Sequence, residues 1–271
     1  MKLGIVVRNM GPQSTRTLIA GCARAAEAAG LDDAWVVDHV AIPPDDAEGS
    51  GGRYLDPLAT LAFLAGITER IGLGSAVLIL PYRPPLPTAK AVATIQDLSG
   101  GRLKLGVGVG WMPAEFRALG VPRERRGALA DEALALLRRA FEAADDVVEA
   151  HGQPFLFRPR PPRPPILVGG APPHALARAA RFGDGWLPMG ADPQALRAPI
   201  ADLRRRFAEA GREAPEVIAM GRLPLDDPPR AREQLAALSG IGVTGLVYGG
   251  DRYADEAAFA RSAERLAGLR N

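Results

Sequence analysis

Two ionisable residues that could transfer protons, Asp38 and His39, stand side by side directly after a short apolar segment at residues 34–37. An imidazole exchanges a proton near neutral pH, so His39 could protonate a carbonyl or imine as hydride arrives there. The other two histidines, His151 and His174, fall in a loop and in the first turn of a predicted helix, and we interpret both as structural. His39 and Asp38 are therefore the predicted catalytic residues.

Glycines cluster at the ends of three further apolar segments. The clusters are Gly72 and Gly74, then Gly106, Gly108 and Gly110 before Trp111, then Gly169 and Gly170 before Ala171. Because glycine lacks a β-carbon, such segments let a flat ring system lie directly on the backbone. A single glycine is more often explained by packing inside the protein, but three clusters together favour a ligand.

The third cluster leads into a predicted helix that begins near His174. Free amides at the start of a helix bind phosphate through their N–H groups and the helix dipole. Pro172 and Pro173 are equally typical of a plain helix start. The motif alone therefore does not establish a phosphate site.

These residues need a framework, and short apolar runs alternate with longer amphipathic segments along the whole chain. The eight runs, predicted as strands, are residues 3–7, 34–37, 71–80, 103–107, 166–168, 185–189, 216–220 and 243–247. Between them, apolar residues recur at three- and four-residue spacing, as in residues 129–144, which predicts helices. The length of 271 residues is close to the roughly 250 of one (β/α)8 barrel. We predict an α/β protein with a single TIM-barrel domain over residues 1–271.

An open, doubly wound sheet is the alternative, but it requires a dinucleotide-binding fingerprint. The nearest match, residues 106–111, lacks the last glycine because position 113 is proline. In a barrel, the predicted site residues share the end where strands terminate. Two segments are predicted as loops: residues 41–53 at that end, and residues 148–165, ending in a proline-rich run, at the opposite end.

Composition excludes several classes of function. Apolar residues make up 47% of the chain and the net charge is +2, which gives no strong field for nucleic acid. No apolar stretch approaches the roughly 18 residues of a membrane helix, and no secretory signal is apparent, so we expect a cytoplasmic protein. The single cysteine, Cys22, excludes an internal disulfide or a cysteine-based metal site and is predicted to be buried and inert.

Taken as an ordered set, several segments closely resemble the luciferase-like monooxygenase superfamily. They are residues 25–39, 68–74, 98–111, 166–170 and 179–186. The chain looks most like the branch that uses the deazaflavin coenzyme F420, and less like the flavin monooxygenases. The resemblance implies a luciferase-like TIM barrel that holds its cofactor at the C-terminal ends of the strands.

The resemblance also implies residue roles. His39 would donate or accept a proton at the reactive ring edge, with Asp38 positioning His39 or the ring. The implied cofactor-binding residues are Ser75, Ala76 and Val77 behind the ring, with a cis peptide between Ala76 and Val77, then Gly108, Gly110 and Trp111 along the cleft, and Gly169, Gly170 and Ala171 at the phosphate. Glu115 matches a frequent family acid, and its alternative is a solvated charge on a helix.

We therefore predict an oxidoreductase that transfers hydride between F420 and a small-molecule substrate. The alternatives are an FMN-dependent monooxygenase of the same fold and a non-catalytic flavin-binding barrel. The connections after the fifth and seventh strands are short, and nothing selects the substrate. We expect no metal, no nucleic acid and no membrane partner, and the resemblance implies a possible homodimer.

Overall fold

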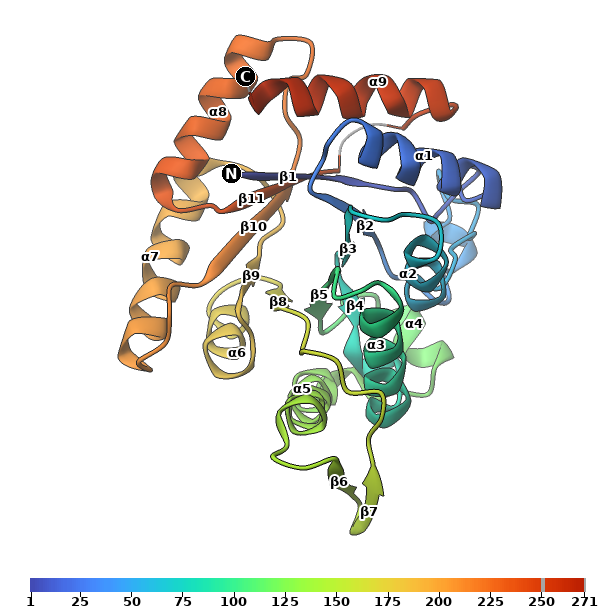
Figure 1. The fold of residues 1–271 in the computed structure, drawn as a ribbon, viewed down its shortest axis with the longest axis vertical. Helices are drawn as coiled ribbons and strands as arrows, with labels where there is room; N and C mark the ends of the chain where they lie inside the picture. Colours follow the sequence, from blue (N-terminus) through green and yellow to red (C-terminus); the bar gives the residue numbers. More distant parts are fainter. Residues whose placement is uncertain (250–251, 271) are drawn as a thin grey trace.

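The computed structural model describes residues 1–249 and 252–270, and its centre is a closed barrel of parallel strands (Figure 1). The barrel strands are β1 (Lys2–Val6), β2 (Asp33–Val36), β3 (Gly72–Ser75), β4 (Leu78–Ile79), β5 (Leu103–Gly108), β8 (Ile166–Gly169), β9 (Gly185–Leu187), β10 (Glu216–Gly221) and β11 (Gly245–Tyr248). β3 and β4 are two parts of one barrel position, and the pairing of β3 with β5 closes the ring. The predicted barrel and its eight strand positions are confirmed.

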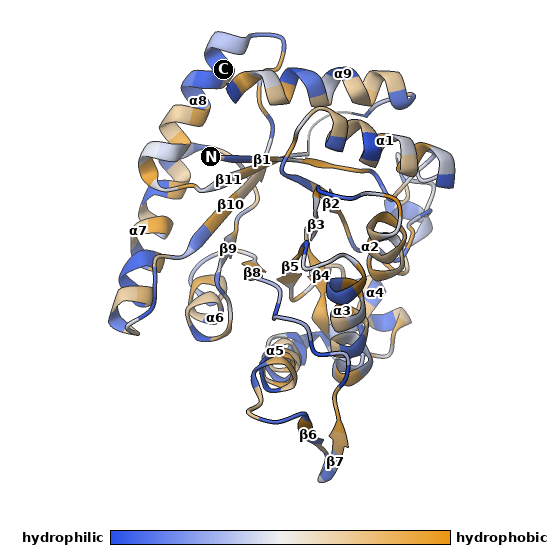
Figure 2. Ribbon diagram, in the orientation of Figure 1, coloured by the Kyte–Doolittle hydropathy of each residue, from blue (hydrophilic) through white to orange (hydrophobic). Residues whose placement is uncertain are grey.

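Helices surround the barrel and connect successive strands (Figure 1). They are α1 (Arg16–Ala28), α2 (Pro57–Ala65), α3 (Pro85–Leu98), α4 (Pro113–Ala118), α5 (Arg126–Glu142), α6 (His174–Phe182), α7 (Pro193–Glu209), α8 (Pro228–Ile241) and α9 (Glu256–Ala267), with 3-10 turns η1 (Pro44–Asp46), η2 (Leu80–Tyr82), η3 (Arg123–Arg125) and η4 (Gly268–Arg270). Aspartate side chains cap the first turns of α2, α7, α8 and α9, accepting hydrogen bonds from backbone amides. In Figure 2, α7, α8 and α9 carry both hydrophilic and hydrophobic residues, as amphipathic helices do.

The barrel interior is filled by apolar side chains, with Trp35 as the largest. Trp35 is fully buried, and glycines on both neighbouring strands make room for it. A β-carbon at Gly4 would lie 2.6 Å from Trp35 Nε1, and one at Gly74 would lie 2.2 Å from Trp35 Cε3. Gly74 is therefore explained by packing, and the interior of the barrel is closed below the site.

One predicted loop is wrong in part, because residues 148–165 include a β-hairpin. Strands β6 (Val147–Ala150) and β7 (Gln153–Leu156) pair antiparallel and project from the barrel (Figure 1). The turn is His151-Gly152, with positive φ at both residues. A tight hairpin turn requires that backbone, which Gly152 adopts freely, and a histidine before the glycine is a weaker turn signal than asparagine or aspartate.

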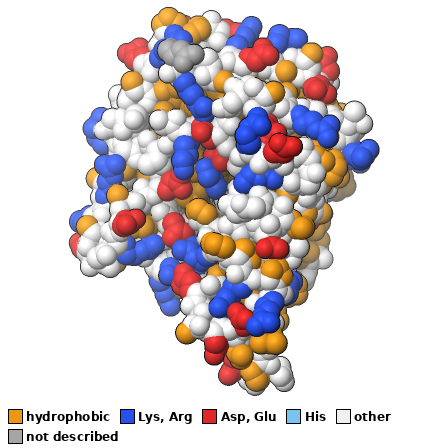
Figure 3. Space-filling model, viewed as in Figure 1, with side chains coloured by type: hydrophobic (Ala, Val, Ile, Leu, Met, Phe, Trp, Pro, Cys, Tyr) orange, Lys and Arg blue, Asp and Glu red, His pale blue; other side chains and the backbone are white. Residues whose placement is uncertain are grey.

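The outer surface carries charges of both signs. Basic and acidic side chains are interspersed over the face in Figure 3. Within the described residues, the helices are all too short or too polar to cross a membrane. The Cys22 thiol is fully buried in α1, as predicted, and burial raises its pKa to about 12, which disfavours the reactive thiolate.

Candidate active site

His39 lies just beyond the end of β2, at the mouth of the barrel, and its ring is held by a carboxylate. The imidazole Nδ1 is 2.8 Å from Glu115 Oε2. The histidine side chain is 18% exposed, whereas the glutamate side chain is fully buried. His39, which follows β2, and Glu115 of α4 are far apart in the sequence but in contact at the mouth.

Glu115 lies in the first turn of α4, where Pro113 begins the helix. Its Oε1 accepts the backbone amides of Val40 at 2.6 Å and Ala41 at 3.0 Å, and its Oε2 accepts the Tyr82 hydroxyl at 2.9 Å. The alternative of a solvated helix charge is wrong, because no part of this side chain reaches solvent. Both of its carboxylate oxygens take part in hydrogen bonds.

These hydrogen bonds determine the ionisation of Glu115. Burial alone would raise its pKa, but the amides of Ala41 and Val40, together with His39, outweigh burial and lower the pKa below its ordinary value. Glu115 is therefore an anion near neutral pH, and an anion can only accept from His39 Nδ1–H. The proton on Nδ1 fixes the tautomer, so Nε2 is the nitrogen left to accept or donate a proton.

Tyr82 contributes through the same carboxylate. Burial and the neighbouring Glu115 raise the pKa of Tyr82 far above its ordinary value, so the hydroxyl keeps its proton and donates to Glu115. Edge contacts hold the imidazole ring itself. The His39 centroid lies 5.0 Å from that of Tyr54 and 6.2 Å from that of Trp111.

Asp38, predicted as a catalytic partner for His39 or the ring, is bonded elsewhere. Its carboxylate accepts two hydrogen bonds from the Arg83 guanidinium, at 2.6 and 2.9 Å, and one from the Ile79 amide at 2.8 Å. Arg83 also donates to Asp56 Oδ2 at 2.9 Å. The carboxylate that orients His39 is that of Glu115, and Asp38 ties β2 to the segment after β4.

The stretch Ser75-Ala76-Val77 separates β3 from β4, and the Ala76–Val77 peptide is cis, as predicted. Ser75 is fully buried, and its hydroxyl donates to Gly106 O at 2.8 Å. The Ser75 side chain is thus part of the barrel wall. Val77, which is only partly buried, is the residue of this stretch that faces the mouth beside Val37 and Met220.

The predicted glycines accommodate this stretch. A β-carbon at Gly106 would lie 2.0 Å from Ser75 O, while one at Gly108 or Gly169 would lie 2.5 or 2.7 Å from a methyl of Val77. Packing, the alternative stated for the single glycines, therefore accounts for these three positions. Gly110 has φ +76°, which turns the chain toward Trp111.

Apolar side chains and free amides surround the mouth. Trp111 is 63% exposed, Val40 50% and Met189 71%, and all three follow barrel strands. Gly170 and Ala171 are exposed ahead of α6, beside a cis Pro172–Pro173 peptide. Large exposed apolar side chains next to a helix N-terminus offer a surface for a ring and donors for a phosphate.

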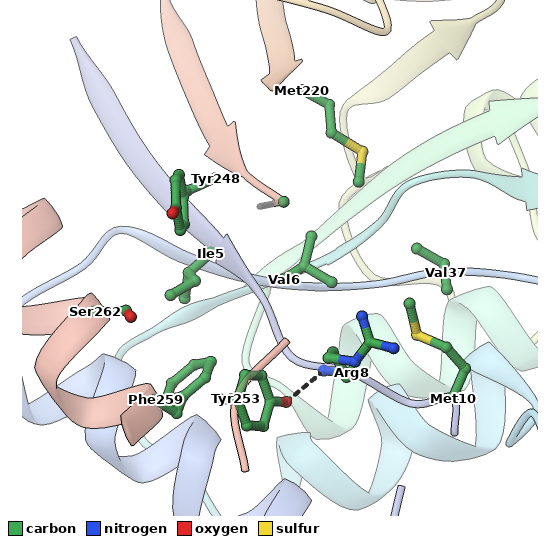
Figure 4. Close-up of a pocket in the computed structure, with 11 residues that line it drawn as sticks. Ile5, Val6, Arg8, Met10, Val37, Met220, Tyr248, Tyr253, Phe259 and Ser262 are labelled. Atoms are coloured by element: carbon green, nitrogen blue, oxygen red, sulfur yellow. Dashed lines mark hydrogen bonds between the residues drawn. The ribbon is translucent and has the colours of Figure 1, made fainter. Parts of the chain in front are cut away.

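A cavity of about 60 Å³ opens beside this mouth, at the end of β1 (Figure 4). Its walls are mostly apolar and include Val6, Val37, Met220 and Phe259, and among the described residues that line it Arg8 is the one that carries a charge. The Arg8 amide donates to the Tyr253 hydroxyl at 2.9 Å. Figure 4 shows the guanidinium directed to the same side as Val6 and Met10.

Several residues of this site were not predicted: the apolar residues Val40 and Met189, and the polar residues Arg8, Tyr54, Tyr82 and Arg83. Tyr82 and Arg83 follow β4, the last part of a predicted strand, so a search of every strand end would have included them. Arg8 directly follows the first predicted strand and carries the same signal. Tyr54 follows the loop at residues 41–53 and gives no such signal.

Comparison with known proteins agrees with this geometry. A family model described as luciferase-like monooxygenase matches residues 1–270. The uncharacterized protein Rv0953c of Mycobacterium tuberculosis is 34% identical over 268 residues, which cover 92% of each chain. The 5,10-methylenetetrahydromethanopterin reductase of Archaeoglobus fulgidus is 29% identical over 215 residues, covering 76% of this chain and 60% of the reductase.

Solved structures share the fold at lower identity. An F420-dependent secondary alcohol dehydrogenase, in complex with an F420-acetone adduct, has a TM-score of 0.80 at 15% identity and covers 100% of this chain and 99% of its own. The oxygenating constituent of 3,6-diketocamphane monooxygenase from Pseudomonas putida, in complex with FMN, has a TM-score of 0.78 at 16% identity, covering 98% and 96%. At these identities the likeness concerns the fold.

Proposed function

This chain belongs to the luciferase-like monooxygenase family, and we propose that it is an oxidoreductase that exchanges hydride between coenzyme F420 and a small organic substrate. The observation that carries the proposal is the contact between His39 Nδ1 and the buried Glu115 carboxylate at the barrel mouth. It leaves Nε2 of a partly exposed imidazole as the group that exchanges a proton. A hydride-transfer reaction at a carbonyl or imine requires such a group.

The residues around the mouth fit a deazaflavin. Trp111, Val40 and Met189 are exposed apolar side chains that a planar ring would cover, and Val77 lies at the floor. The exposed residues Gly170 and Ala171, ahead of α6, would hold the phosphate. When bound, the cofactor supplies or accepts the hydride, and the protein positions it.

Within this arrangement the protein moves one proton. As the substrate is reduced, His39 Nε2–H donates its proton to the oxygen or nitrogen on which negative charge develops. In the reverse direction Nε2 accepts that proton. The Glu115 anion accepts from Nδ1–H and so leaves Nε2 for the substrate, while the Val40 and Ala41 amides lower the pKa of Glu115 and keep it ionised. Glu115 is thus a positioning residue, and His39 is the proposed catalytic residue.

Two observations favour F420 over FMN. The 5,10-methylenetetrahydromethanopterin reductase of Archaeoglobus fulgidus is 29% identical over 76% of this chain, and a structural neighbour, the tetrahydromethanopterin reductase of Methanopyrus kandleri, is named as dependent on coenzyme F420. The connections after β8 and β10 are also short, since α6 begins at His174 and α8 at Pro228. An oxygenase must shelter a reactive oxygen species from water, and short connections leave this side of the mouth open to solvent.

The cofactor assignment is tested by titrating the purified protein with F420 and, separately, with FMN, following the fluorescence of each. We expect F420 to bind at least about tenfold more tightly, a free-energy difference of about 1.4 kcal/mol. Tighter binding of FMN would instead support a flavin monooxygenase, as in the FMN-bound structural neighbour. Binding of neither would contradict both cofactor assignments.

A further inference from the structure

The guanidinium of Arg8 is a cation without a partner among residues 1–249 and 252–270. Its Nε is buried, and none of the described residues accepts a hydrogen bond from this side chain or forms an ion pair with it. Other partly buried arginines of the chain are paired: Arg83 with Asp38, and Arg163 with Asp184. An unsatisfied buried donor such as this Nε costs free energy, and a ligand that accepts a hydrogen bond from it would recover that cost.

Arg8 lies where a substrate of the proposed reaction would reach it. It lines the cavity of about 60 Å³, which Val37 lines as well, two residues before His39. Met10, another lining residue, forms a backbone bridge with Tyr54, whose ring centroid is 5.0 Å from that of His39. Two residues that line the cavity, Val37 and Met10, are thus neighbours of His39 along the chain and of its ring partner Tyr54 across a backbone bridge.

The cavity is kept open above its apolar floor. A β-carbon at Gly249 would lie 3.0 Å from Met220 Cε and 3.6 Å from Val6 Cγ2, so any side chain larger than that of glycine would crowd this wall. Phe259, fully buried, and Ile5 close the opposite side. The volume admits a group of only a few non-hydrogen atoms.

On this basis we propose that Arg8 binds the carboxylate of the substrate, so that this enzyme acts on small organic acids. The planar guanidinium fork matches a carboxylate with two parallel hydrogen bonds. One cation in apolar walls neutralises a monoanion, whereas a phosphate monoester near neutral pH carries close to two charges and would leave one uncompensated. The inference rests on the proposed function, since it places the acid's reactive carbon toward His39.

The test measures binding of pyruvate and 2-oxobutyrate against their uncharged methyl esters, by calorimetric titration of the full chain. In the wild type we expect each acid to bind at least about tenfold more tightly than its ester. Arg8→Met should abolish this preference, and Arg8→Lys should retain part of it, because lysine keeps the charge but not the fork. Arg24→Met, which removes an exposed cation on α1, should leave the preference unchanged.

Thermal unfolding separates recognition from a structural role. Because Arg8 has no partner in the described residues to lose, Arg8→Met should not lower the Tm, whereas a structural arginine would. Equal binding of acid and ester by the wild type, or an unchanged preference in Arg8→Met, would overturn the proposal, as would tighter binding of inorganic phosphate than of the acids.

The titrations are run without cofactor and repeated with F420 bound. An acid preference that depends on Arg8 in a protein that binds neither F420 nor FMN would leave the carboxylate site standing while the proposed function fails. F420 binding without any preference for the acids would support the proposed function and contradict the carboxylate site. The two failures are therefore distinguishable.

Discussion

The proposed chemistry depends on one proton position, Nε2 of His39. Glu115 fixes that position by accepting from Nδ1, and Glu115 is itself anchored by two backbone amides and the Tyr82 hydroxyl. Four hydrogen bonds on one buried carboxylate leave it little freedom to move. The imidazole can therefore exchange a proton with a substrate without reorienting.

Replacing His39 tests the catalytic role. His39→Gln should lower turnover about 10²- to 10⁴-fold with little change in cofactor affinity, because general acid catalysis contributes that much. The measurement is steady-state kinetics with reduced F420 and a confirmed substrate, alongside cofactor titration. The control is His151→Asn, which keeps a residue that tolerates positive φ in the hairpin turn. Unchanged turnover in His39→Gln would show that the histidine is structural.

Glu115 makes a prediction about stability and pH. Its folded pKa lies below its ordinary value of 4.5, so its contribution to stability is fully present above that value and is lost as the pH falls through the folded pKa. Glu115→Gln lacks this titration. The difference in free energy of unfolding between wild type and Glu115→Gln should therefore be constant near neutral pH and shrink below about pH 4.5. A difference that grows toward acid pH, in urea unfolding series, would contradict the assignment.

At the residue scale the sequence predicted the groups better than their partners. His39 was found from its place after a strand, which the alternation of apolar runs locates well. Its partner Glu115 came only from the family resemblance, and Asp38, the neighbour in sequence, proved to be bound to Arg83. Adjacent side chains at the end of a strand point in different directions, so neighbours along the chain need not share a task.

At the scale of elements, the break between β3 and β4 shapes the site. The intervening residues push Ser75 against β5 and leave Val77 at the mouth, and the glycines of β5 and β8 make room for them. From the sequence, we predicted that these glycines lie against a bound ligand. The structure shows that they act first by packing, which a pattern of residue types cannot separate from ligand contact.

Substituting one of these glycines tests the packing argument. Gly106→Ala should lower the free energy of unfolding by about 3 kcal/mol, because its β-carbon would lie 2.0 Å from the Ser75 carbonyl oxygen, a backbone atom. Gly240→Ala is the matched control on α8, where an added β-carbon meets nothing within 4 Å. Helix propensity predicts a gain of about 0.5 to 1 kcal/mol there. Equal effects of the two substitutions on urea unfolding would refute the argument.

At the scale of the whole molecule, the barrel was predictable because its signals are redundant. Eight apolar runs with amphipathic segments between them fit one closed parallel sheet, and each run was located to within a few residues. The hairpin of β6 and β7 was missed because it lies outside that repeat. The position of Arg8 relative to His39 could not be predicted either, since it depends on the curvature of the closed barrel.

We propose that this barrel transfers hydride between F420 and its substrate and does not insert oxygen into the substrate. The most direct measurement supplies the protein under air with reduced F420 and a panel of small oxo acids, and separately with reduced FMN, while absorbance and dissolved oxygen are followed together. We expect at least one acid to accelerate the protein-dependent oxidation of reduced F420, with no protein-dependent consumption of oxygen. Protein-dependent oxygen consumption with reduced FMN, together with no acceleration by any substrate in the F420 arm, would contradict the account.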